Sequence, residues 1–171
     1  MQSIIRHNHS EMNEFSGLLR IIIYSALDCM PSLGMLTINA LAAADSVVIP
    51  VQAHYLPLKG MTQLVKTIGK VQRQINPRLK IDGVVLTLAD MRTNLARSTA
   101  DSLKENYGKV IRVYQTVIPV GVKAAETSAA GQSIYSYDKN GAVAKAYEAF
   151  TKEVLKDGEK KRNRTEPSPC R

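Results

Sequence analysis

The stretch SVVIPV at residues 46–51 decides the fold class of this chain. Its valines and isoleucine are β-branched, so the run favours a β-strand. The run is apolar on both faces instead of alternating with polar residues. Because a strand in the middle of a parallel sheet is covered by helices on each side, this pattern is typical of such a strand. We therefore predict an α/β fold with residues 46–51 inside the sheet.

Short apolar runs alternate with longer amphipathic segments on both sides of this strand. On the amino-terminal side, residues 21–27 read as a strand, and the alanine-rich residues 36–44 favour a helix. On the carboxy-terminal side we predict helices at 58–75, 94–107 and 143–155, strands at 80–88 and 110–118, and a loop-rich segment at 121–138. This alternation predicts a mostly parallel sheet flanked by helices.

The two ends of the chain differ from this central domain, which we place at residues 21–156. The first 20 residues have no clear periodicity and remain unassigned. Residues 157–171 are basic and contain Pro167 and Pro169, so we expect a disordered tail.

Composition excludes several classes of protein. The 171 residues suffice for one domain with a buried core. No apolar run approaches the ~20 residues that cross a bilayer, and the start has no signal-peptide layout, so we expect a cytoplasmic protein without a membrane partner. Cys29 and Cys170 form no disulfide framework, and no Cys/His spacing indicates zinc.

The chain is strongly basic, with a net charge of +8 and a pI near 9.6. Such a charge attracts polyanions, and nucleic acid is the first candidate. The alternative is an ordinary solvated basic surface with a basic tail, and charge alone does not separate the two.

Three predicted strands are followed closely by a charged residue. Ligands of open α/β sheets bind beyond the carboxyl ends of the strands, so these charged residues are candidate ligand contacts. Asp28 follows the first of these strands. A carboxylate there suits Mg²⁺, which prefers oxygen ligands, although an aspartate also caps helices and turns. Arg92 and Lys123 each follow a later strand. Together they form a candidate phosphate-binding pair, or they are common loop cations.

A longer stretch carries a specific resemblance. Residues 28–45 read DCMPSLGMLTINALAAAD. They resemble the D-C-x-P-S-L-G…T-x-N-A-L-x-A-A-D segment of ParA/Soj chromosome- and plasmid-partition ATPases. The resemblance continues in order along residues 27–155, through VIPVQ at 48–52, GMTQL at 60–64, RTNL at 92–95, VIP at 117–119 and YD at 137–138. It implies a P-loop NTPase-like fold.

The resemblance also implies site residues and cofactors, ATP and Mg²⁺ in the intact family. Asp28 matches the Walker-B aspartate that organises Mg²⁺, and Pro119 and Val120 match residues of the adenine pocket. The following residues match the switch segment that senses the nucleotide: Cys29, Met30, Pro31, Ser32, Leu33 and Gly34.

Further residues match the family's macromolecular contacts. Arg92 and Lys123 match basic positions with which the ATP-bound dimer binds DNA without sequence preference. Lysine at 123, where the family has arginine, keeps the charge but loses bidentate geometry. The implied partners are non-specific DNA, a ParB-type protein and a second ParA copy, and the implied location is the nucleoid.

The chain departs from the family in its phosphate-binding loop. Family members begin with a strand and a glycine- and lysine-rich loop whose backbone amides cradle the phosphates. The pattern G-x-x-x-x-G-K-[ST] does not occur in these 171 residues. We therefore expect an amino-terminally truncated member, without the first strand and the loop, that does not bind ATP productively or hydrolyse it.

Two other hypotheses stay open. The chain is a non-enzymatic interaction module that pairs with full-length ParA or ParB, or it is a decayed fragment without function. A MinD-like membrane-bound relative is disfavoured, because residues after 155 read as polar and basic and not as an amphipathic membrane-binding helix.

Overall fold

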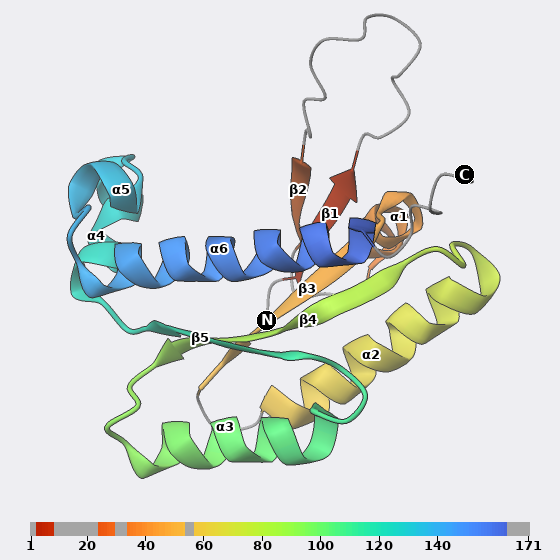
Figure 1. Ribbon diagram of the computed structural model, residues 1–171, viewed down its shortest axis with the longest axis horizontal. Helices are drawn as coiled ribbons and strands as arrows, with labels where there is room; N and C mark the ends of the chain where they lie inside the picture. Colours follow the sequence, from red (N-terminus) through yellow and green to blue (C-terminus); the bar gives the residue numbers. More distant parts are fainter. Residues whose placement is uncertain (1–2, 9–23, 30–33, 54–56, 164–171) are drawn as a thin grey trace, which may run out of the picture.

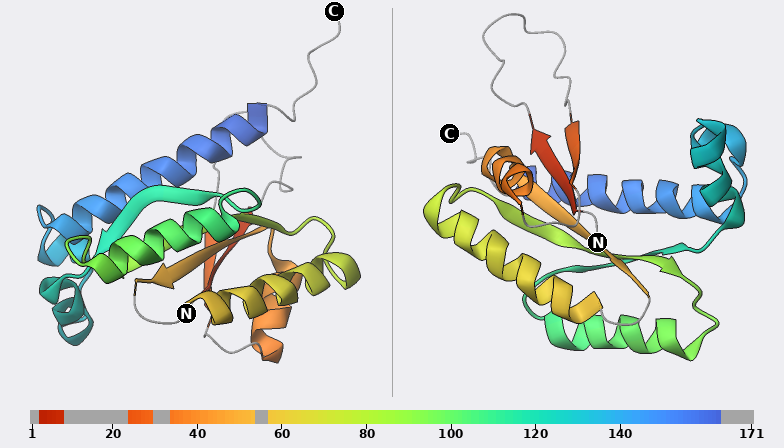
Figure 2. Two further views of the ribbon diagram at one scale, coloured as in Figure 1. Left: turned by 90° about the horizontal axis from the view of Figure 1, so that it is seen from below. Right: turned by 180° about the vertical axis from the view of Figure 1, so that it is seen from behind.

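A computed structural model describes residues 3–8, 24–29, 34–53 and 57–163 of the chain (Figures 1 and 2). These residues contain a five-stranded sheet in the order β2-β1-β3-β4-β5. The strands are β1 (Ser3–Asn8), β2 (Tyr24–Cys29), β3 (Ser46–Gln52), β4 (Lys80–Ala89) and β5 (Val113–Pro119). The helices are α1 (Met35–Ala43), α2 (Pro57–Gln74), α3 (Asn94–Tyr107), α4 (Val122–Ala130), α5 (Ile134–Tyr137) and α6 (Ala142–Asn163).

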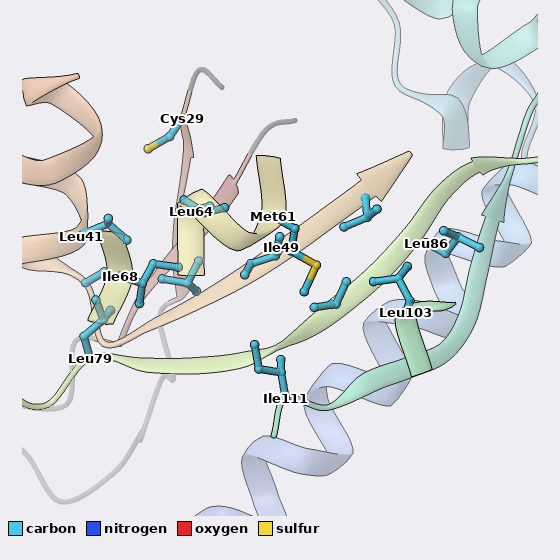
Figure 3. Packing of buried hydrophobic residues seen from close by; sticks show 14 of the residues in the cluster. Cys29, Leu41, Ile49, Met61, Leu64, Ile68, Leu79, Leu86, Leu103 and Ile111 are labelled. Atoms are coloured by element: carbon cyan, nitrogen blue, oxygen red, sulfur yellow. The ribbon is translucent and has the colours of Figure 1, made fainter. Parts of the chain in front are cut away.

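Helices cover both faces of the sheet, as the pattern of residues 46–51 predicts. Val47 and Ile49 of β3 point into a large core cluster that includes side chains of α1, α2 and α3, such as Leu41, Met61 and Leu103 (Figure 3). Val48, between them in sequence, belongs to a second cluster on the opposite face, where α6 packs. The strand is therefore buried from both sides, and the predicted α/β class is confirmed.

The sheet is parallel in only one part. β3 pairs with β4 and β4 pairs with β5, both in parallel. β1 is antiparallel to both of its neighbours, β2 and β3. β2 consequently runs in the same direction as β3, with a strand of opposite direction between them. This strand comes from the segment that we could not assign from sequence.

The helices differ from the sequence prediction in the segment 121–138. We predicted a loop-rich stretch, but it contains α4 and α5. Alanine-rich residues favour the first of these helices. Gly131 ends it in a left-handed conformation with φ 60°, where glycine is the least strained residue. Ser133 then caps α5 by accepting a hydrogen bond from Ser136 N.

The last helix is longer than predicted. α6 continues to Asn163 and so enters the segment 157–171 that we expected to be disordered. Lysine and arginine are good helix formers, and their positive charge suits the carboxyl end of a helix. The remainder of that segment, 164–171, lies outside the described residues, as do residues 21–23 of the strand predicted at 21–27.

A single carboxylate connects α6 to the edge strand β5. Glu153 Oε1 accepts hydrogen bonds from Gln115 N and from Arg112 Nη2, each at 3.0 Å. Glu153 Oε2 accepts from Thr116 N at 3.1 Å and from Thr116 Oγ1 at 2.8 Å. The pairing of β5 with β4 shifts register in this region, and the carboxylate binds the main-chain amides there. Burial raises the pKa of Glu153, but these hydrogen bonds outweigh burial and lower it overall.

Candidate functional site

The three parallel strands end at one edge of the sheet, and four of the predicted site residues lie there, namely Arg92, Pro119, Val120 and Lys123. We call this the carboxyl edge and define it by the turns at residues 90–93 and 119–123. The first segment connects β4 to α3 and carries Arg92. The second leads from the end of β5 into the first turn of α4, which carries Lys123. Because β4 and β5 are neighbours in the sheet, the structure brings these two residues to adjacent strand ends.

The turn that carries Arg92 is held by its own hydrogen bonds. The carbonyl oxygen of Asp90 accepts from Thr93 N at 2.9 Å and from Thr93 Oγ1 at 2.7 Å. Thr93 Oγ1 also accepts from Ala96 N and thereby caps α3. Leu88, just before the turn, has a φ of 50°, which strains a residue other than glycine. These hydrogen bonds therefore fix the backbone conformation at the end of β4.

The Arg92 side chain is solvent-exposed but has a partner. Its exposed fraction is 91%, and its guanidinium makes two hydrogen bonds of 2.9 Å to the two carboxylate oxygens of Asp90. The hydrogen bond to Arg92 is the main reason why the pKa of Asp90 is lowered. Arg92 can thus reach a ligand in solvent, although its charge already faces a carboxylate.

Lys123 has a similar arrangement near the start of α4. Its Nζ lies 3.2 Å from Asp138 Oδ1, with exposed fractions of 62% for the lysine side chain and 23% for the aspartate. Asp138 ends α5, where its backbone N–H donates to Ile134 O. Gly141 lies against it, because a Cβ at that position would overlap the Asp138 carboxylate. The aspartate is therefore the more fixed member of this pair.

Arg97 is a further cation at this edge that the sequence motifs did not single out. It lies on the first turn of α3, and its Nε donates to the carbonyl oxygen of Met91 at 2.9 Å. That bond ties Arg97 to the turn of Arg92. The Thr93 cap was a usable signal, because it fixes the start of the helix and hence the turn on which residue 97 lies.

Pro119 and Val120, the predicted adenine contacts, lie at the end of β5. Pro119 is partly buried and pairs with Ala89 of β4, whereas Val120 is exposed. Other large apolar side chains are exposed close to the same strand ends, namely Leu88, Met91, Leu95 and Val122. The carboxyl edge thus combines cations with apolar surface, and the role of Pro119 and Val120 remains a prediction.

Asp28 does not join the two cations. It is exposed at the end of β2, whose place in the strand order is three strands away from β4. At a strand spacing of about 4.8 Å, that order separates the two strands by about 14 Å. Burial is the main reason why the pKa of the neighbouring Cys29 thiol is raised. Gly34 is the N-cap of α1, and Met30, Pro31, Ser32 and Leu33 lie outside the described residues.

The described residues do not fit ATP with Mg²⁺. At this edge, Ser3 at the beginning of β1 lies opposite Cys29 at the end of β2. A phosphate-binding turn would need a strand that ends at this edge and is followed by a helix. The strand between β2 and β3 is β1, and it begins at this edge instead.

Comparison with known proteins identifies the class of the fold. The chain is similar to cobyrinic acid a,c-diamide synthase from Mycobacterium smegmatis, with a TM-score of 0.60 and 33% identity over 75% of this chain and 44% of that one. A second structure of that enzyme, with bound ADP and magnesium, matches with a TM-score of 0.61 and 32% identity over 77% of this chain and 46% of that one. The fold is that of an α/β P-loop-type NTPase.

Sequence comparison then gives the family. Residues 19–81 match the family model of an AAA domain. The chain is 45% identical to the sporulation initiation inhibitor protein Soj of Bacillus subtilis over 135 residues, which are 79% of this chain and 53% of Soj. It is 41% identical to the chromosome partitioning protein ParA of Caulobacter vibrioides over 132 residues, 77% of this chain and 49% of that protein. The chain belongs to the ParA/Soj family of partition proteins, and it spans about half the length of these relatives.

Among the described residues, no helix is long and apolar enough to cross a membrane.

Proposed function

We propose that this chain acts in chromosome or plasmid partition, at the nucleoid. The family resemblance implies ATP-dependent, sequence-independent DNA binding for the intact protein, and this chain retains the sequence-independent DNA contacts. The carboxyl edge carries the DNA contacts, and Arg92 and Lys123 bind phosphates. One observation carries the proposal: two exposed cations lie at the ends of adjacent parallel strands. Contacts to phosphates position a protein on DNA without reading its sequence.

The charge of the whole chain supports this proposal. A net charge of +8 attracts DNA over a distance set by the salt concentration. Arg97 adds a third cation beside the turn that carries Arg92. Phosphate contacts release counterions, so the affinity falls steeply as salt rises.

We also propose that these 171 residues do not hydrolyse ATP. The sequence lacks G-x-x-x-x-G-K-[ST], and β1 begins at the edge where a phosphate-binding turn is needed. Catalysis of phosphoryl transfer rests on positioning and charge stabilisation, so loss of the loop abolishes it. The check is phosphate release by the purified chain with ATP and Mg²⁺. Release that depends on the chain and stops when Asp28 is changed to Asn contradicts the proposal.

The DNA contacts are tested by fluorescence anisotropy with short labelled duplexes of unrelated sequence at low salt. The unaltered chain is expected to bind all of them with similar affinity. The double variant Arg92→Ala with Lys123→Ala is expected to bind ~10-fold or more weakly to every duplex, because it loses two phosphate contacts.

A matched control removes the same charges elsewhere. Lys66→Ala with Arg73→Ala also takes one lysine and one arginine from exposed positions, but on α2. It is expected to lose much less affinity than the double variant at the carboxyl edge. Equal losses in the two variants refute a specific role for Arg92 and Lys123.

A second candidate function is a non-enzymatic module that pairs with full-length ParA or ParB. Exposed apolar side chains at the β2–α1 end of the sheet favour it: Met35 is 70% exposed and Leu36 is 83% exposed. A pull-down with purified full-length ParA and ParB tests it. Absence of a complex at micromolar concentration rules it out for these partners.

A further inference from the structure

Both cations that we assign to DNA contacts already have an acidic partner within the chain. Arg92 binds Asp90 with two parallel hydrogen bonds of 2.9 Å. Lys123 lies 3.2 Å from Asp138. Each pair is formed near a strand end, by residues of one turn in the first case and by α4 and the end of α5 in the second.

In each pair the carboxylate is fixed more firmly than the cation. Asp90 Oδ1 also accepts a hydrogen bond from Arg92 N, and the Asp90 carbonyl oxygen closes the turn. Asp138 is set by its helix-end bonds and by the space that Gly141 leaves. The cations are the more exposed members of the pairs. The exposed fraction of the side chain is 91% for Arg92 and 38% for Asp90. It is 62% for Lys123 and 23% for Asp138. A phosphate from solvent therefore meets the cation with a carboxylate already on its inner side.

We propose that Asp90 and Asp138 are built-in competitors of DNA phosphate, each of which weakens DNA binding by occupying the cation that the phosphate needs. This inference rests on the proposed function, because it assumes that Arg92 and Lys123 are the DNA contacts. A cation paired with a carboxylate presents little net charge, and DNA must replace one anion by another. Exposed ion pairs are weak, so the competition reduces the affinity by ~2- to 5-fold per pair and leaves binding possible.

Arg97 provides an internal comparison. Its bond to the Met91 carbonyl leaves the positive charge facing a neutral group, not a carboxylate. On this account its contribution to DNA binding does not depend on Asp90. Loss of Arg97 is therefore expected to weaken DNA binding equally in the unaltered chain and in the Asp90→Asn variant.

The test uses isosteric variants of the full chain in the DNA-binding measurement described above. Asp90→Asn and Asp138→Asn keep the shape and an acceptor oxygen but remove the charge. Each is expected to raise DNA affinity by ~2- to 5-fold relative to a control that also removes one negative charge, Asp101→Asn at an exposed position of α3. The control accounts for the general effect of a more positive protein.

A double-mutant cycle assigns the gain to the pair. The gain from Asp90→Asn is expected to vanish when Arg92 is alanine, and the gain from Asp138→Asn when Lys123 is alanine. Gains equal to that of Asp101→Asn, or a loss of affinity because the carboxylate positions the cation, overturn the inference. If Arg92→Ala with Lys123→Ala binds as well as the unaltered chain, the proposed function itself has failed.

Discussion

The two edges of the sheet are stabilised in different ways. At the β5 edge, Glu153 of α6 binds main-chain amides of the strand, and Phe150 packs edge-on against Tyr114 with ring centroids 5.0 Å apart. At the β2 edge, Leu27 of the strand is exposed, and Met35 and Leu36 of the neighbouring helix are exposed too. The β5 edge lies beside the candidate DNA contacts, whereas the β2 edge carries Asp28. The proposed DNA contacts therefore lie beside a firmly packed edge. Asp28, which the family resemblance predicts to organise Mg²⁺, lies at an edge with exposed apolar side chains.

The largest effect that separates the edges is expected from Glu153→Ala. The change leaves two backbone N–H groups and a threonine hydroxyl without their acceptor and removes the partner of Arg112. We expect a loss of about 2–4 kcal/mol in the free energy of unfolding, measured by urea denaturation. Glu148→Ala is the control on the same helix, because Glu148 forms an exposed pair with Lys152. Its cost should stay below about 0.5 kcal/mol, and equal costs for the two variants contradict the comparison.

A smaller effect is expected from pH acting on the same carboxylate. The pKa of Glu153 is lower in the folded chain than in the unfolded chain. Its charged form therefore stabilises the fold fully above the ordinary glutamate pKa of about 4.3, and this contribution is lost as pH falls through the lower folded pKa. Glu153→Gln should accordingly be less stable than the unaltered chain at pH 7, with a difference that shrinks below about pH 4. A difference that stays constant from pH 7 to pH 3 shows that the charge of Glu153 has no part in stability.

The smallest effect on stability is expected at the opposite edge. Leu36 is 83% exposed, so Leu36→Ser removes little buried surface and should change the free energy of unfolding by less than about 0.5 kcal/mol. Leu41→Ala, at a fully buried position later in α1, should cost about 2–5 kcal/mol. A large cost for Leu36→Ser means that this side chain is covered in solution, by a second copy or by another part of the chain.

The central fold could be predicted because local and tertiary signals agree there. The apolar run at 46–51 and the helix at 94–107, which Thr93 caps, correspond to β3 and α3 in the structure. In residues 3–8 (SIIRHN) the local sequence pattern does not indicate a strand. β1 forms there because these residues pair with β2 and β3. We predicted a loop-rich segment at 121–138, although Gly121 and Gly131 mark the two ends of α4.

The candidate site was predictable in part. Arg92 and Lys123 follow strand ends, and their position at one edge follows from parallel pairing. Their acidic partners could not be predicted equally well from the sequence. Asp90 is close to Arg92 in sequence, so a local pair could have been foreseen. Asp138 meets Lys123 only because α4 and α5 fold back on each other, and no sequence spacing indicates that contact.

The most direct test of this account is the salt dependence of DNA binding by the unaltered chain and by the double variant Arg92→Ala with Lys123→Ala. Each phosphate contact contributes about 0.9 to the slope of log K against log salt concentration. The account predicts binding to duplexes of any sequence, with a slope that becomes shallower by about 1–2 in the double variant. An unchanged slope, with the affinity of the unaltered chain retained, contradicts the assignment of the carboxyl edge as the DNA-binding surface.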